Sequence, residues 1–470
     1  MSQTTKGTRE QQPGLRTGCL SFFEVLGQSI ANIAPTATPA ITIPVVFASA
    51  GNATWVAYLF AMLAIILLGI QINVFSKRSA TPGALYTYIS QGLGNGGGFV
   101  SGSGLVMAYL ITGSAVLCGF ANYANNLLGY AGLKVSPALL ILIGTIVAWV
   151  LTYKGVELSA KVMLVSEALS VSLIAILGII VLVNHRFNVG TAQLTMQGSS
   201  FNSIRMGLVF AFFSFVGFES ATAMGREAKN PLRNIPKAVM GSGIVVGIFF
   251  VVMSLIMVMG FAGAKTSLGE STAPLTYLAQ QSHIGIFGFF IDIGATISFW
   301  SCGVASITAA ARVMMSMSDQ GYLPKSVSKC HQTNKTPYIA TAACAVVVGG
   351  VPVILEILKN SNMDVYNYTG TLAVYGFLLS YLLISIAAPV YLFKLKELKW
   401  NNLLTAVVAI ILICIPLVGS VYPLPGYPMV VLPFVFVGWL ILSLAWCMIV
   451  KNRNPLQARA DAALQEESNG

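Results

Sequence analysis

Phe210-Ala-Phe-Phe-Ser-Phe-Val-Gly-Phe-Glu219-Ser-Ala221 lies near the middle of the chain and combines features that rarely occur together. Its aromatic side chains are typical of a membrane helix, yet Gly217 and the carboxyl group of Glu219 stand among them. Ionisable residues are costly inside a membrane and usually mark a functional position there. We therefore interpret this stretch as an interrupted membrane helix that carries a functional acid.

A second interrupted stretch lies near the N-terminus, Gly27-Gln-Ser-Ile-Ala-Asn-Ile-Ala-Pro-Thr-Ala-Thr-Pro39. It contains Pro35 and Pro39, and Pro44 follows closely. Each proline removes a backbone donor and obstructs the preceding helical turn. We expect two half-helices joined by unwound backbone near Ala34–Thr38. Such backbone persists at membrane depth only where protein buries it or where it lines a wet cavity.

The composition predicts an integral membrane protein. Of the 470 residues, 56% are hydrophobic and 9% are charged, whereas about 25% are charged in soluble domains. Apolar runs of about 20 residues recur along the chain, which indicates membrane helices and not barrel strands. The net charge of +11 is interpreted as a signal for orientation in the bilayer, and no nucleic-acid partner is expected.

The pattern of apolar runs predicts twelve spans. They lie at roughly 19–48, 53–74, 98–128, 136–153, 159–183, 203–225, 238–262, 284–315, 338–358, 365–393, 402–420 and 428–450. With a cytoplasmic N-terminus, the lysines and arginines expected outside are few among the 26 in the chain, namely Lys134, Arg186, Arg205, Lys265 and Lys359. This bias follows the positive-inside rule. We therefore expect a multi-pass protein of the plasma or inner membrane with cytoplasmic tails at 1–18 and 451–470.

The two interrupted spans are the first and the sixth. Paired interruptions at corresponding positions of two halves are typical of inverted-repeat transporters. Repeats with an odd number of spans are antiparallel to each other. The ends of half-helices expose unpaired N–H and C=O groups, which suit the carboxylate and ammonium groups of an amino acid. For the first span taken alone, a simple proline-kinked helix is the alternative.

Further motifs follow the predicted spans 2, 6 and 8. They are Ser79-Ala-Thr-Pro-Gly-Ala-Leu-Tyr-Thr-Tyr88, Glu227-Ala-Lys-Asn-Pro-Leu-Arg-Asn-Ile-Pro236 and Ser318-Asp-Gln-Gly-Tyr-Leu-Pro324, the last preceded by Arg312. With the central motif, they resemble the amino acid–polyamine–organocation (APC) superfamily over about residues 19–450. The resemblance implies an all-α, LeuT-like fold of 5+5 helices, with repeats at about 19–183 and 203–393. Two more helices would follow at about 402–450.

The resemblance also implies a substrate site between the broken spans 1 and 6. The implied substrate-binding residues are Ile33, Ala34, Pro35, Thr36, Ala37, Thr38, Tyr109, Phe213, Ser214, Phe215, Gly217 and Ser306. In that scheme the backbone of span 1 holds the substrate carboxylate, Phe213 and Phe215 stack on or gate the substrate, and the carbonyls of Ser214 and Gly217 hold its amine. Span 1 departs from the usual Gly-Ser-Gly pattern. Its prolines supply no N–H, so we expect threonine hydroxyls to compensate.

Three buried acids are candidates for coupling or gating. By the resemblance, Glu219 matches an acid thought to sense pH in proton-coupled relatives. Glu167 in span 5 matches a position where some relatives carry a lysine in place of a sodium ion, and there it could titrate or hold a cation. Glu24, near the cytoplasmic end of span 1, is assigned to structure or gating. A fourth acid, Asp292, is expected to hydrogen-bond to neighbouring helices. For Glu167 and Glu219 the alternative is a structural, hydrogen-bonded acid.

The predicted function is secondary active transport of an amino acid or small amine by alternating access, with proton-coupled uptake favoured. An exchanger and a sodium symporter remain open, and a channel or a membrane receptor is the runner-up from another class. The seven cysteines and three histidines show neither metal-ligand nor catalytic spacing, so we expect no enzyme, metal site or cofactor beyond a coupling H⁺ or Na⁺. The expected partners are the solute and the lipid bilayer, and the chain is expected to be a monomer or a loose homodimer.

Overall fold

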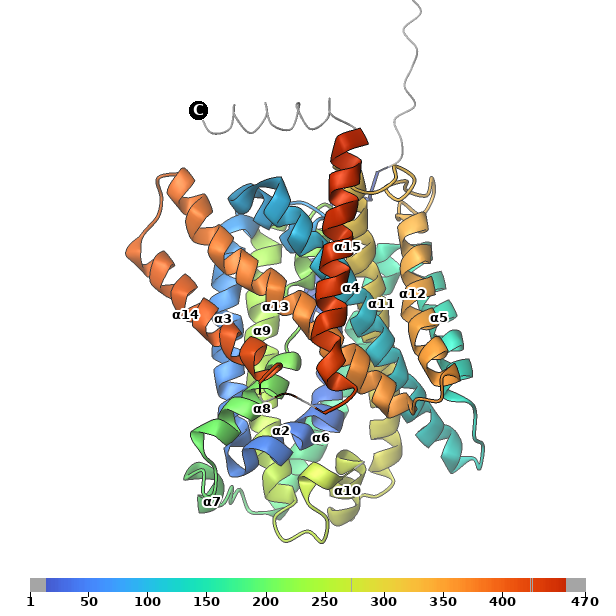
Figure 1. Ribbon diagram of the computed structural model, residues 1–470. Helices are drawn as coiled ribbons and strands as arrows, with labels where there is room; N and C mark the ends of the chain where they lie inside the picture. Colours follow the sequence, from blue (N-terminus) through green and yellow to red (C-terminus); the bar gives the residue numbers. More distant parts are fainter. Residues whose placement is uncertain (1–13, 272, 423, 425, 454–470) are drawn as a thin grey trace, which may run out of the picture.

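The computed structural model describes residues 14–271, 273–422, 424 and 426–453, and these residues form an assembly of helices (Figure 1). Within these ranges no β-strand is present, and a single isolated bridge joins Leu20 to Ala228. The all-α class predicted from the sequence is therefore confirmed. The outer parts of both predicted tails, 1–13 and 454–470, lie outside the described residues.

Between residues 14 and 184 the described structure contains seven α-helical or π-helical segments. They are α1 (Phe22–Ile33), the π-helix η1 (Thr38–Thr42), α2 (Ile43–Ala50), α3 (Thr54–Ser76), α4 (Ala84–Tyr130), α5 (Pro137–Lys154) and α6 (Val156–Asn184). The α4 helix bends at Gly94, whose φ of 80° is left-handed. This bend separates a short leading segment from the long span predicted at 98–128.

After α6 the chain forms the short helix α7 (Thr191–Leu194). It continues with α8 (Phe201–Phe213), α9 (Pro231–Gly260), α10 (Pro274–Gln281), α11 (Phe287–Asp319), α12 (Tyr338–Ile357), α13 (Asn362–Lys394), α14 (Trp400–Gly419) and α15 (Leu432–Arg453). Short 3-10 segments lie at Gly51–Ala53, Ser220–Met224 (η3), Leu268–Glu270 and Met429–Val431.

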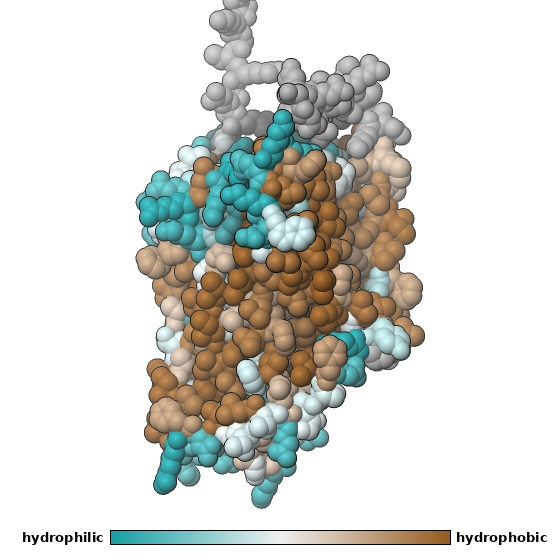
Figure 2. All heavy atoms as spheres, turned by 90° about the vertical axis from the view of Figure 1, so that its left-hand side faces the viewer, coloured by the Kyte–Doolittle hydropathy of each residue, from teal (hydrophilic) through white to brown (hydrophobic). Residues whose placement is uncertain are grey.

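The described residues include 10 helical segments long and apolar enough to cross a membrane. One of them, Phe22–Ser76, runs through α1, α2 and α3, and α8 is apolar but shorter than a full span. Hydrophobic side chains cover the middle of the molecule, and hydrophilic ones gather at its two ends (Figure 2). This distribution fits a protein embedded in a bilayer. The count of twelve spans stays a prediction.

The α4 helix lies at the centre of the assembly, with 94% of its most hydrophobic stretch buried. It packs against α13 through small residues: a Cβ atom on Gly376 would lie 2.3 Å from the carbonyl oxygen of Gly104. Ser101 also donates to Ser380 at 3.2 Å across this contact. In contrast, only 11% of the corresponding stretch around α15 is buried. The core therefore forms around α4, α11 and α13, and α15 lies at the periphery.

Both predicted helix breaks are present. The α1 helix ends at Ile33 because Ala34 adopts a left-handed conformation, with φ 51° and ψ 66°, and Pro35 has no N–H to continue the ladder. The α8 helix ends at Phe213, and Gly217, with φ 87°, turns the chain into η3. These two breaks are the positions around which the candidate site is built.

Candidate functional site

The two breaks face each other through the side chain of Asn32, on the last turn of α1. Its Nδ2 atom donates to the carbonyl oxygen of Gly217 at 3.4 Å, and its Oδ1 atom accepts from Ser306 Oγ of α11 at 2.9 Å. Cys302, one turn before Ser306, lies 3.3 Å from the Asn32 carbonyl oxygen. The structure thus brings the predicted residues Gly217 and Ser306 together through a residue that the sequence analysis did not single out. The only sequence signal for Asn32 was a lone amide in an apolar helix just before a break.

Gly217 cannot be replaced by a larger residue without rearrangement. A Cβ atom there would lie 2.0 Å from Asn32 Nδ2, and the φ of 87° is one that L side chains rarely adopt. The glycine therefore lets the backbone of the second break approach α1 closely.

Serine hydroxyl groups also join α1 to the chain segment that follows the second break. Ser29 Oγ donates to the Phe218 carbonyl at 2.6 Å and accepts from the N–H of Ala221 at 3.0 Å. Ser220 Oγ donates to the Gln28 carbonyl at 3.2 Å. The two bonds of Ser29 pair backbone groups just after the second break, and the bond of Ser220 ties the same segment to α1.

Glu219 lies fully buried between two tyrosines. Tyr109 on α4 donates to Oε1 at 2.7 Å, and Tyr381 on α13 donates to Oε2. The Tyr381 hydroxyl also accepts from the N–H of Gly217 at 3.1 Å. The hydroxyl of Tyr109, a predicted substrate ligand, is thus directed to Glu219, and Tyr381 was not singled out from the sequence at all. This cluster connects α4, α13 and the second break.

Glu167 lies buried on α6, and its two oxygens differ. Ser298 on α11 donates to Oε2 at 2.9 Å, whereas Oε1 has no hydrogen-bond partner among the described residues. Ser301, one turn along α11, faces the same carboxyl group, but its buried hydroxyl lies beyond hydrogen-bond distance of any partner in the described structure. Two unsatisfied oxygen atoms in such a buried place are costly unless something else pairs with them. This place can therefore accept a proton or a cation.

The unwound part of α1 lies next to Glu167. One turn along α6, Ser170 is hydrogen-bonded to Thr36, and Ser170 Oγ donates to the Gly294 carbonyl at 2.9 Å. The Thr36 hydroxyl is thereby engaged with α6. The other predicted residues of this stretch, from Ile33 to Thr38, are all buried.

Phe213 and Phe215 have different environments. The Phe213 ring lies against Gly370 and lines a cavity of about 490 Å³ between α2, α8 and α13. Phe215 is fully buried and packs edge-on against Phe250 of α9, with ring centroids 5.1 Å apart. Between them, Ser214 Oγ lies 3.3 Å from the Tyr58 hydroxyl. Of the two phenylalanines, Phe213 is thus the one that borders an open space.

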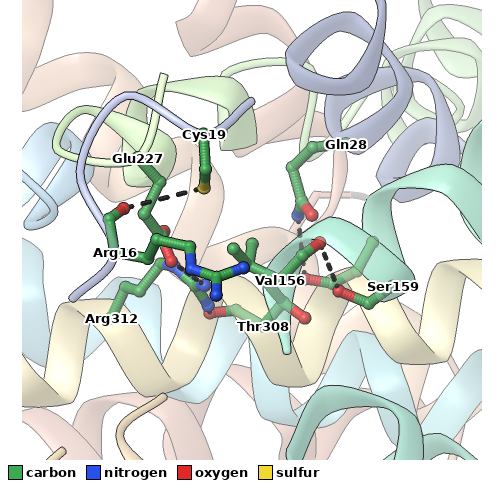
Figure 3. Close-up of polar contacts among 9 residues, drawn as sticks. Arg16, Cys19, Gln28, Val156, Ser159, Glu227, Thr308 and Arg312 are labelled. Atoms are coloured by element: carbon green, nitrogen blue, oxygen red, sulfur yellow. Dashed lines mark hydrogen bonds and ion pairs between the residues drawn. The ribbon is translucent and has the colours of Figure 1, made fainter. Parts of the chain in front are cut away.

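The end of the molecule that carries the N-terminal segment is closed by a buried ion pair (Figure 3). Arg312 of α11 holds both carboxylate oxygens of Glu227, at 2.6 and 2.8 Å, and its third contact is the Thr308 carbonyl at 2.9 Å. The two side chains are 3% and 0% exposed. Both residues belong to motifs quoted above, but their pairing was not predicted.

The segment 14–20 lies across this ion pair and is bound on both sides. Its Leu20 pairs with the backbone next to Glu227, accepting from Lys229 N at 2.8 Å and donating to Glu227 O at 2.9 Å. Arg16 forms an ion pair with Glu157 of α6 at 3.0 Å. The segment thus forms a strap from α6 to the loop before α9. Glu24 accepts from the N–H of Ser21 at 2.7 Å and caps α1 directly after the strap.

No group of three or more His, Cys, Asp or Glu side chains in the described ranges is placed to hold a metal ion. The breaks, Glu167 and Glu219 form the candidate site.

Comparisons with known proteins agree with this architecture. Residues 24–455 match the profile of the family described as amino acid permease. The chain is 26% identical to a branched-chain amino acid permease of Bacillus subtilis (strain 168), over 86% of this chain and 83% of that protein. It is also 26% identical to a vacuolar cationic amino acid transporter 4 of Arabidopsis thaliana, over 67% of this chain and 54% of that protein.

Among solved structures, a Na⁺-coupled sialic acid symporter shares the fold, with a TM-score of 0.55 and 13% identity over 89% of this chain and 91% of that chain.

Proposed function

The chain belongs to the amino acid permease family, and on this premise we propose that it carries an amino acid or related amine across the cell membrane by alternating access. The observation that carries the proposal is the meeting of two helix breaks at Asn32, Gly217 and Ser306. Broken helices that meet inside a membrane protein present backbone dipoles to a solute with both charges. Secondary transport needs such a site and a means of opening it to either side in turn.

The proposed topology has twelve spans and cytoplasmic termini. The α1–α2 pair and the α8–η3 pair would be the corresponding broken spans of inverted repeats at about 19–183 and 203–393, followed by α14 and α15. We also propose that both tails are cytoplasmic. The oligomeric state in this proposal is a monomer or a loose homodimer.

The proposed substrate position lies between the breaks. The backbone from Ile33 to Thr38 would hold the carboxylate, the carbonyls of Ser214 and Gly217 the ammonium group, and Ser306 would face the substrate from α11. The cavity beside Phe213 is lined mainly by apolar side chains, which favours a substrate with an apolar side chain. The Bacillus relative named for branched-chain amino acids supports this choice.

The proposed coupling ion is a proton, taken up at Glu167. Its support is the partnerless Oε1 atom beside the unwound part of α1. A sodium ion is the second candidate, because Oε1 and the hydroxyls of Ser298 and Ser301 are the oxygen ligands that hard cations prefer. In this scheme the strap and the Arg312–Glu227 pair close the cytoplasmic side.

The experiment is uptake into proteoliposomes containing the purified protein, with radiolabelled L-leucine and L-arginine under an inward proton or sodium gradient. We expect saturable uptake of at least one probe, counterflow from preloaded vesicles, and a rise in Tm with that probe. Flux that does not saturate and shows no counterflow would instead indicate a channel and overturn the proposal.

A further inference from the structure

A second cavity, of about 530 Å³, is lined by none of the residues of the two helix breaks. It is formed by the C-terminal end of α4, the loop that follows α4, α10 and the first turns of α11. This is the end opposite the strap, and under the proposed topology it faces outward. The volume is in the range typical of small-molecule sites. Its lining includes polar side chains, namely Asn125, Asn126, Tyr130, Lys134, Thr276 and Asp292.

Asp292 supplies a buried negative charge to this cavity. The residue is 3% exposed, and its side chain receives one hydrogen bond in the described structure, from the Tyr130 hydroxyl at 3.4 Å. The three ion pairs among the described residues join other partners. A buried carboxylate that lacks a cation is costly, so the cavity is suited to a positively charged group beside Asp292.

Lys134 supplies the opposite charge to the same cavity. It is exposed, and it takes part in none of the three ion pairs of the described structure. Asp292 and Lys134 therefore border one space without neutralising each other. A solute with an ammonium group at one end and a carboxylate group at the other matches both charges.

The walls of the cavity are held in place by contacts that do not use these charges. Asn125 Oδ1 accepts from the N–H of Val135 at 3.1 Å, which fixes the loop that carries Lys134. The Tyr130 ring packs edge-on against Phe289 of α11, with centroids 5.4 Å apart. Thr296 donates to the Asp292 carbonyl at 2.7 Å. The two charges are thus presented by an ordered frame, which lowers the entropic cost of binding.

We propose that this cavity is a peripheral binding site for a zwitterionic amino acid, with its ammonium group at Asp292 and Tyr130 and its carboxylate at Lys134. The identity of the solute rests on the proposed function. The site shares no residue with the central one, since that site is built from the helix breaks, α6 and the middle of α11. Its role is to hold the solute at the outer end, near the start of the transport path.

The test is equilibrium dialysis of the purified, full-length protein in detergent with radiolabelled L-leucine and, in parallel, L-arginine. We expect two classes of site for at least one probe. Asp292→Asn and Lys134→Gln should each remove one class and leave the other with its affinity unchanged. Lys134 is exposed, so its variant tests the inference even if Asp292→Asn fails to fold. Glu270→Gln, an exposed acid on the outer loop before α10, is the matched control and should keep both classes.

Three other results are informative. A single class of site that neither variant alters would overturn the peripheral site and leave the proposed function standing. Two classes that both survive Asp292→Asn and Lys134→Gln would overturn the assignment to this cavity. Binding of neither probe to the folded wild-type protein would overturn the proposed function as well.

Discussion

Glu219 and Glu167 are both buried beside a helix break, but their surroundings differ. Glu219 has a tyrosine hydroxyl on each oxygen, one from α4 and one from α13. Glu167 has a serine hydroxyl on one oxygen and no partner on the other among the described residues. Both carboxyl oxygens of Glu219 therefore have hydrogen-bond partners. Glu167 Oε1 lacks one and could bind a proton or a cation.

This difference suggests a division of roles. A completed network fixes the geometry of the elements it joins, so Glu219 is suited to hold the second break against α4 and α13. A network with an unpaired oxygen is stabilised when a proton or cation binds to that oxygen. Glu167 has such an oxygen and lies next to the unwound backbone that follows α1. We expect a conformational change of α1 to depend on whether that place is filled. The two acids are equal candidates from the sequence, and we now expect Glu219 to act as a positioning residue and Glu167 as a coupling residue.

The largest expected effect is a loss of thermal stability when the buried ion pair between Glu227 and Arg312 is broken. Here a third buried acid is fully neutralised by a partner. Arg312→Ala leaves this carboxylate buried and unpaired, which should cost about 3–5 kcal/mol. The measurement is the Tm of the purified protein, compared with Arg78→Ala, which removes an exposed ion pair with Glu397. Exposed pairs contribute at most about 1 kcal/mol. Equal Tm values for the two variants would show that burial of the first pair is unimportant.

The second largest expected effect is a loss of proton-driven uptake on substitution of Glu167. Glu167→Gln keeps the size of the side chain and removes its ability to exchange a proton, so uptake driven by a pH gradient should fall by about tenfold or more. Counterflow should persist, because exchange of substrate requires no net proton transfer. The control is Glu270→Gln, an exposed acid that takes part in none of the three ion pairs of the described structure. Unchanged uptake with an intact pH response would remove Glu167 from the coupling role.

The smallest expected effect is a modest loss of thermal stability when a tyrosine that donates to Glu219 is replaced. Tyr381→Phe removes a donor to Oε2 and the acceptor of the Gly217 N–H, whereas Tyr109→Phe removes one donor alone. Each lost hydrogen bond should cost about 1 kcal/mol of stability. The Tm should therefore fall further for Tyr381→Phe than for Tyr109→Phe, with the pH response of uptake retained in both. A lost pH response would assign coupling to Glu219 instead.

Sequence features with local causes were predictable. Pro35 and Gly217 break helices through the geometry of their own backbone, so both breaks were found without tertiary information. The same holds for the membrane class, since hydropathy is a property of each segment alone. By contrast, the number of spans was harder to assign, because a broken span is shorter than a complete one, as α8 shows.

What the sequence by itself determined is that the chain is apolar and helical, where two of its helices break, and that Glu24, Glu167, Glu219 and Asp292 lie within apolar stretches. Only the tertiary structure decided which groups meet: Arg312 with Glu227, Asn32 with Gly217 and Ser306, and two tyrosines with Glu219. The physical reason is that breaks and burial follow from local backbone and hydropathy. Hydrogen bonds and ion pairs instead join residues on helices far apart in the chain, and their formation depends on how those helices pack.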